Sequence, residues 1–173
     1  IKMNETIISE PLNKDLNKFI LSIFKDINLL KVLENNSWVA GGFARIVANC
    51  QFNMQQENFH DEIKNYLFKH RGDIDIFSVS SENIRKCLNI LTNYNDLKKN
   101  KISAVESEFA NVFSKNVEFY RDDCFDLRRS IKVQLVNKFF YQNISECFTS
   151  FDFVNCKFAL TLEEGNMIIN YTH

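Results

Sequence analysis

The chain is poor in the two residue types that interrupt regular structure. Its 173 residues include four glycines and a single proline. A chain with so few backbone breakpoints retains glycine where the local geometry requires it. Three of the four glycines, at positions 41, 42 and 72, fall in two short segments. These two segments are therefore the first candidates for a functional site.

Three further features are missing, and each excludes a class of protein. The 21 Lys and Arg residues nearly balance the 22 Asp and Glu residues, so we expect no broad basic surface for long nucleic acids. No apolar run reaches the roughly 18 residues of a membrane-spanning helix, so we expect no membrane contact and a cytoplasmic location. The five cysteines include no C-x-x-C pair and are expected to be free thiols in a reducing compartment.

The periodicity of apolar residues indicates one α/β (α+β) domain over residues 1–173, in which helices flank a mixed sheet. One or two helices are predicted in an N-terminal segment, residues 12–35, and residues 51–71 are interpreted as an insertion with a short amphipathic helix. Further helices are predicted at 43–50, 81–93 and 144–149, and strands at 37–40, 73–79, 116–120, 131–136, 152–161 and 166–171. Residues 104–112 are ambiguous, although neighbouring helix formers favour an exposed helix face for Glu106 and Glu108.

Two aspartates share one face of the predicted strand 73–79. Asp73 and Asp75 are two residues apart, so their side chains point the same way, while Ile74 and Ile76 point to the opposite face. Adjacent carboxylates repel each other, and a divalent cation between them removes that repulsion. Mg²⁺ takes one or two carboxylates together with substrate phosphates. The alternative for a bare D-x-D pattern is an edge strand with two solvated aspartates.

The Gly41-Gly42 pair follows an apolar strand and precedes a helix. Glycine lets the backbone approach a ligand closely, and free N–H groups at a helix start can bind phosphate. Arg45, on the first helical turn, can add a charge-assisted contact. The alternative is a plain strand-to-helix turn. Neither a P-loop nor a dinucleotide fingerprint is present, since the required Lys and third glycine are missing.

The order of these motifs resembles the nucleotidyltransferase superfamily, which contains DNA polymerase beta, poly(A) polymerases and tRNA CCA-adding enzymes. The resemblance rests on V-A-G-G-F-A-R at 39–45, D-I-D-I-F at 73–77 and F-D-F at 151–153. Residues 151–159 also look like the R-D-F-T-x-N-A-x-A strand of the bacterial CCA-adding branch. Small phage and viral nucleotidyltransferase-like proteins show a similar order. The resemblance covers about residues 37–160.

The resemblance implies an enzyme that transfers a nucleoside monophosphate from an NTP to a hydroxyl group. The acceptor would be an RNA 3′ end, a small molecule or a protein. Two Mg²⁺ (or Mn²⁺) ions would be held by Asp73, Asp75 and Asp152, and the phosphates would be cradled by Gly41, Gly42 and Arg45. In such chemistry, positioning and charge neutralisation supply most of the catalysis.

Departures from the family pattern leave two alternative functions open. The insertion at 51–71 lengthens the spacing between the two motifs, and Gln134 stands where a third carboxylate is expected if Asp152 belongs to the other strand pattern. A non-catalytic protein of the same fold, used for binding, is one alternative. An unrelated α/β binding module is another. The sequence identifies neither the nucleotide, the acceptor nor the oligomeric state.

Overall fold

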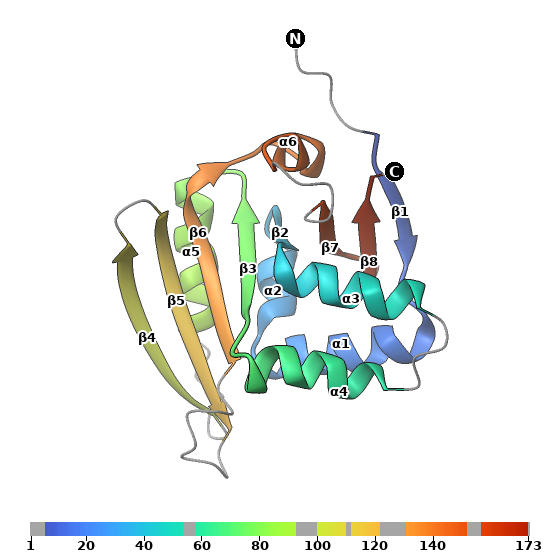
Figure 1. The fold of residues 1–173 in the computed structure, drawn as a ribbon. Coiled ribbons are helices and arrows are strands. Elements are labelled where there is room, and N and C mark those ends of the chain that lie inside the picture. Colours follow the sequence, from blue (N-terminus) through green and yellow to red (C-terminus); the bar gives the residue numbers. More distant parts are fainter. Residues whose placement is uncertain are drawn as a thin grey trace.

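Eight strands form one mixed sheet in the order β1-β8-β7-β2-β3-β6-β5-β4 (Figure 1). The computed structural model describes residues 6–53, 58–92, 100–109, 112–121, 131–151 and 157–172. The strands are β1 (Ile8–Pro11), β2 (Ser37–Ala40), β3 (Asp73–Ser78), β4 (Asn100–Phe109), β5 (Val112–Arg121), β6 (Ile131–Phe140), β7 (Phe158–Glu163) and β8 (Asn166–Tyr171). The predicted fold class, helices flanking a mixed sheet, is confirmed.

The helices are interspersed with the strands along the chain. They are α1 (Lys14–Asp26), α2 (Leu29–Leu33), α3 (Gly42–Phe52), α4 (Phe59–Lys64), the π-helical turn η1 (Asn65–Lys69), α5 (Ser81–Thr92) and α6 (Ile144–Thr149). Among the described residues, no helix is long and apolar enough to cross a membrane.

Strand β3 lies in the middle of the sheet, and its neighbours on the two sides differ in direction. It pairs antiparallel with β2 and parallel with β6, whereas the other pairs of neighbouring strands are antiparallel. The register places Asp75 opposite Ala40 of β2 and beside Gln134 of β6. The candidate carboxylates therefore lie at the centre of the sheet rather than on an edge strand.

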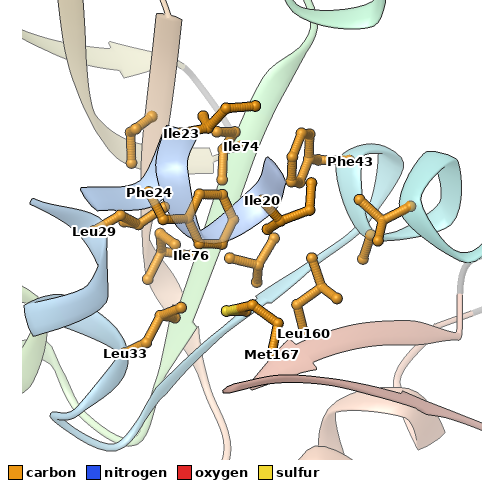
Figure 2. Packing of buried hydrophobic residues seen from close by; sticks show 14 of the residues in the cluster. Ile20, Ile23, Phe24, Leu29, Leu33, Phe43, Ile74, Ile76, Leu160 and Met167 are labelled. Atoms are coloured by element: carbon orange, nitrogen blue, oxygen red, sulfur yellow. The ribbon is translucent and has the colours of Figure 1, made fainter. Parts of the chain in front are cut away.

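The main core lies between one face of the sheet and the helices. Ile74 and Ile76 of β3 are fully buried there, and Figure 2 shows them facing Phe24 of α1 and Leu29 of α2. The side of α3 that bears Phe43 closes the same cluster. Alternation along β3 then directs Asp73 and Asp75 to the opposite face.

A smaller apolar cluster covers part of that opposite face. Trp38, Phe77 and Val136 pack there against Cys147 and Phe148 of α6. Helix α6 lies at the end of the sheet where β3 finishes (Figure 1). The cluster therefore covers the end of β3, whereas the carboxylates stand at its beginning.

The predicted N-terminal helical segment is confirmed, and two other helices begin with a side-chain cap. Helices α1 and α2 fill the predicted N-terminal helical segment. The side chain of Asn143 caps α6 by accepting from the Glu146 N–H at 2.9 Å. Ser80 Oγ accepts from the Asn83 N–H at 3.0 Å at the start of α5.

The preference for a helix face at Glu106 and Glu108 was wrong. Residues 100–109, with Glu106 and Glu108 among them, form strand β4, which pairs along its whole length with β5. Strand β5 is longer than the predicted 116–120, and β1 was not predicted at all. Pairing of β4 with β5, the next strand along the chain, outweighed the local helix preference. Of the predicted strand 152–161, the structure describes the part that begins at Phe158 as β7.

Candidate functional site

The two aspartates of β3 point to the same face of the sheet, as predicted from their spacing. Both are partly exposed, whereas Ile74 and Ile76 between and after them are fully buried. On the neighbouring strand β6, the register partners of Asp73 and Asp75 are Lys132 and Gln134. The face around the carboxylates is therefore polar on its β6 side.

The surroundings of the Asp75 carboxylate disfavour its charged form. Its Oδ1 atom is buried and has no hydrogen-bond partner among the described residues. Burial, and secondly the nearby charge of Asp73, raise the pKa of Asp75 to about 7 from its ordinary 3.8. When the carboxylate is ionised, its Oδ1 atom lacks both the solvent and the donors that normally stabilise it. A cation bound here would supply what is missing.

Gly41 begins α3 immediately beside Asp75. Its φ of 88° lies in the left-handed region, which favours glycine. A Cβ atom at this position would lie 2.9 Å from Asp75 Oδ2. The Gly41 carbonyl accepts from the Arg45 N–H at 3.0 Å and so starts the helix. Conformation and close approach therefore both require glycine here, and Arg45 is placed, exposed, on the first turn.

Tyr66 accounts for the two other glycines of the predicted segments. Its hydroxyl donates to the carbonyl oxygen of Asp73 at 2.8 Å. A Cβ atom on Gly42 would lie 2.7 Å from the Tyr66 hydroxyl oxygen, and one on Gly72 would overlap the ring. Sequence reasoning missed this residue. The signal was present in the two glycines. Gly42 lies shortly after β2 and Gly72 directly before β3, and together they leave room for one large side chain.

Charges around Tyr66 form one electrostatic cluster. Burial, and then the charges of Asp75 and Asp73, raise the pKa of the Tyr66 hydroxyl, while Arg45 lowers it. These groups come from three different elements, α3, η1 and β3. The fold therefore brings together Asp73, Asp75, Gly41 and Arg45, with Tyr66 added from the predicted insertion.

The third predicted carboxylate, Asp152, lies outside the described residues. Within the described ranges no group of three or more His, Cys, Asp or Glu residues is arranged to hold a metal ion. Gln134 stands beside Asp75, at the position where the sequence comparison had anticipated a carboxylate. An acidic residue, Glu118 of β5, is the register partner of Lys132. The described residues thus offer a cation two carboxylates, Asp73 and Asp75.

Three of the cysteines confirm the prediction of free thiols. Cys50, Cys87 and Cys147 are unpaired and buried. Burial is the main cause that raises the pKa of the Cys50 and Cys147 thiols to about 12, so they are protonated at neutral pH and inert as nucleophiles. Cys124 and Cys156 lie outside the described residues.

Comparison with known proteins corrects the family assignment. Neither the curated proteins nor the solved structures gave a match. The family model that matches, over residues 10–172, is described as Gabija anti-defense 2 family protein, and no nucleotidyltransferase family was found. Assignment to the nucleotidyltransferase superfamily was therefore wrong, because motifs of three to seven residues recur wherever a strand turns into a helix beside an acidic strand. The chain belongs to the Gabija anti-defense 2 (Gad2) family of phage anti-defense proteins.

Proposed function

We propose that this chain binds a nucleoside triphosphate together with Mg²⁺ or Mn²⁺ at Asp73 and Asp75 and transfers the nucleoside monophosphate to a hydroxyl acceptor. The proposal rests on the geometry of the site and not on family membership. The observation that carries it is the buried, unpartnered Oδ1 of Asp75 beside a second carboxylate. Two carboxylates with further ligands from phosphate are a common way for proteins to hold Mg²⁺.

Different residues would bind the cation and the phosphates. Asp73 and Asp75 would hold the cation, which neutralises phosphate charge and lowers the pKa of an attacking hydroxyl when bound. The exposed guanidinium of Arg45 would contact the outer phosphates. Gly41 lets the backbone at the start of the 11-residue helix α3 pass close to Asp75, so that helix N–H groups lie near the bound anion. Tyr66 fixes the Asp73 backbone through its hydrogen bond.

A non-catalytic binding role is the second candidate, and one observation favours it. Gln134, an amide that cannot act as a base, is the β6 neighbour of Asp75. A site with two carboxylates can hold a metal–nucleotide complex without turning it over. Release of pyrophosphate from a bound NTP separates the two candidates, since the binding role predicts none.

The family name indicates the process in which this binding would act. We propose that the chain counters the Gabija defense, as the name of its family states, through the nucleotide held at Asp73 and Asp75. The acceptor would be an RNA 3′ end, a small molecule or a protein side chain. A chain that carries Asp73→Asn and Asp75→Asn is then expected to lose protection of phage in Gabija-bearing bacteria.

Thermal denaturation of the pure protein with each NTP tests the binding step. With Mg²⁺ or Mn²⁺, at least one NTP should raise the melting temperature, and EDTA should abolish the rise. The Asp73→Asn/Asp75→Asn variant should lose the rise entirely. The control Asp15→Asn/Asp26→Asn neutralises two exposed carboxylates on α1 and should retain it. A rise that survives in the Asp73→Asn/Asp75→Asn variant would contradict the metal-site assignment.

A further inference from the structure

A groove runs along the outer side of α3, between that helix and the α4–η1 segment. The two helical segments lie side by side with opposite directions (Figure 1). They enclose a cavity of about 670 Å³, a size typical of small-molecule sites. Segment 51–71, predicted from the sequence as an insertion, supplies one complete wall of this groove.

The α3 wall extends directly from the glycine turn. Ile46, Asn49 and Asn53 line the groove, and with Gly42 they occupy one stripe of the helix on successive turns. From Gly42 to Asn49 the helix rises about 10 Å. One end of the groove therefore lies at Tyr66, whose hydroxyl is packed against Gly42, and the other lies about two turns further along α3.

The opposite wall connects the groove to the carboxylates through one residue. Glu62 and Asn65 line this wall together with Tyr66. The hydroxyl of Tyr66 donates to the Asp73 carbonyl, so the same side chain lines the groove and supports the strand that carries the site. Tyr66 lies in the π-helical turn η1, a distortion that is frequent at functional sites.

The chemistry of the lining suits an uncharged aromatic ligand with hydrogen-bonding edges. Asn49 and Asn65 offer paired amide donors and acceptors, and Glu62 offers an acceptor for amino groups. Such groups recognise the edges of nucleobases. Phe52 and Tyr66 add aromatic surface on which a base can stack. No Lys or Arg is among the described residues that line the groove, so it is unsuited to phosphates.

We propose that this groove binds the base and sugar of a nucleotide whose phosphates lie at Gly41, Arg45 and the carboxylates. The inference rests on the function proposed above and adds where the nucleoside part lies. The amide and aromatic groups of the groove suit a nucleoside, whereas Arg45 and the proposed cation ligands Asp73 and Asp75 suit phosphates. Asn49, one amide on the α3 wall, then contributes to base selection.

Titration of each of the four ribonucleosides, without phosphates and in EDTA, tests the groove directly. Binding is followed by shifts of backbone amide signals in ¹H–¹⁵N NMR spectra. At least one nucleoside should shift signals of α3 and of 62–70 with millimolar affinity. Asn49→Ala should weaken that binding about tenfold, the discrimination expected of a bidentate base contact. Asn89→Ala, an exposed asparagine on α5, is the matched control and should bind like the wild type.

The outcome distinguishes this inference from the proposed function. In the Asp73→Asn/Asp75→Asn variant, nucleosides should still bind while the metal-dependent effect of NTPs is lost. Metal-dependent NTP binding that is unaffected by Asn49→Ala, with no nucleoside shifting the groove signals, would overturn the groove and leave the carboxylate site intact. Nucleoside binding that an NTP with Mg²⁺ fails to displace would also overturn it, because base and phosphates would then belong to different molecules.

Discussion

The two ends of strand β3 both bury polar groups, but only one end satisfies them. At its C-terminal end, the Ser78 hydroxyl contacts the Asn36 carbonyl at 3.2 Å and the Ser37 hydroxyl at 3.3 Å, and the Asn83 amide donates to it. Near its N-terminal end, Asp75 Oδ1 has no partner among the described residues. The same strand thus carries one complete polar network and one incomplete site.

The difference separates structural polar residues from candidates for ligand binding. Buried polar groups in folded proteins are normally hydrogen-bonded, and each exception needs an explanation. The Ser78 network needs none, because its donors and acceptors meet each other and it ties the turn before β2 to α5. The function proposed above would explain the Asp75 carboxylate by a cation bound there. Variants at the two ends should therefore respond in opposite ways.

The largest expected effect is the pH dependence caused by Asp75. Its pKa rises from 3.8 in the unfolded chain to about 7 in the fold, so between these values the folded state binds more protons. The contribution of Asp75 to stability is then fully present below pH 3.8 and is lost as the pH rises through 7. The shift corresponds to about 4 kcal/mol. Chemical denaturation over this range should show that wild-type stability decreases relative to that of Asp75→Asn by up to this amount.

Magnesium provides the control for the pH experiment. At a pH above 7, added Mg²⁺ should stabilise the wild type and leave Asp75→Asn unaffected, because only the wild type has the charge to bind it. Parallel pH profiles for the two proteins would mean that Asp75 is not perturbed and that the comparison between the ends of β3 fails.

At the satisfied end, loss of one donor should destabilise the fold. Asn83→Leu removes the amide that donates to the Ser78 hydroxyl and to the Asn35 carbonyl. Leaving these buried acceptors without that donor should cost about 3 kcal/mol, measured by urea denaturation, at every pH. Asn89→Leu, on an exposed position of the same helix, should change the stability little. Equal effects of the two variants would show that the network is not stabilising.

Gly72→Ala tests whether Tyr66 explains the glycines at the unsatisfied end. The added Cβ would overlap the Tyr66 ring, and overpacking of this kind costs about 2 kcal/mol. In the double variant Gly72→Ala/Tyr66→Leu the clash is absent, so its loss of stability should be smaller than the sum of the two single losses. Additive losses would show that the ring and Gly72 do not constrain each other.

The smallest expected effect comes from the hydroxyl of Tyr66. Tyr66→Phe removes its hydrogen bond to the Asp73 carbonyl and should cost about 1 kcal/mol of unfolding free energy. Tyr141→Phe is the matched control, because the Tyr141 hydroxyl pairs with Ser150 at the exposed surface, where the change should be smaller. A larger loss in Tyr141→Phe would reverse the assignment of Tyr66 as the support of β3.

Features that depend on neighbours in sequence could be predicted. The alternation of Asp73 and Asp75 with two isoleucines follows from strand geometry alone. The turn between the predicted strands 152–161 and 166–171 is equally local, and it has positive φ at Glu164 (51°) and Gly165 (80°), as a two-residue hairpin requires. Helix caps at Ser80 and Asn143 likewise depend on contacts within three residues.

Features that depend on tertiary contacts could not be predicted from the sequence. Strand β1 has four residues with a proline and is held by β8, which lies at the other end of the described chain. Strand β4, although its partner β5 is close in sequence, depends on that pairing and not on the local preference of its residues. The position of Tyr66 against Gly42 and Gly72 required the packing of α4 and η1 beside α3. Short motifs also suggested a family to which the chain does not belong, because they encode a local turn and not a fold.

The position of the last hairpin has a consequence for the order of folding. Strand β2, which leads into the glycine turn, lies between β3 and β7, and Ala40 pairs with Ala159 on the β7 side. During synthesis, β7 and β8 emerge after every other described strand. Until then the edge of β2 is open and the core lacks Leu160 and Met167. Sheet closure by contacts so distant in sequence is slow, so the glycine turn beside Asp75 reaches its final geometry only at the end of folding.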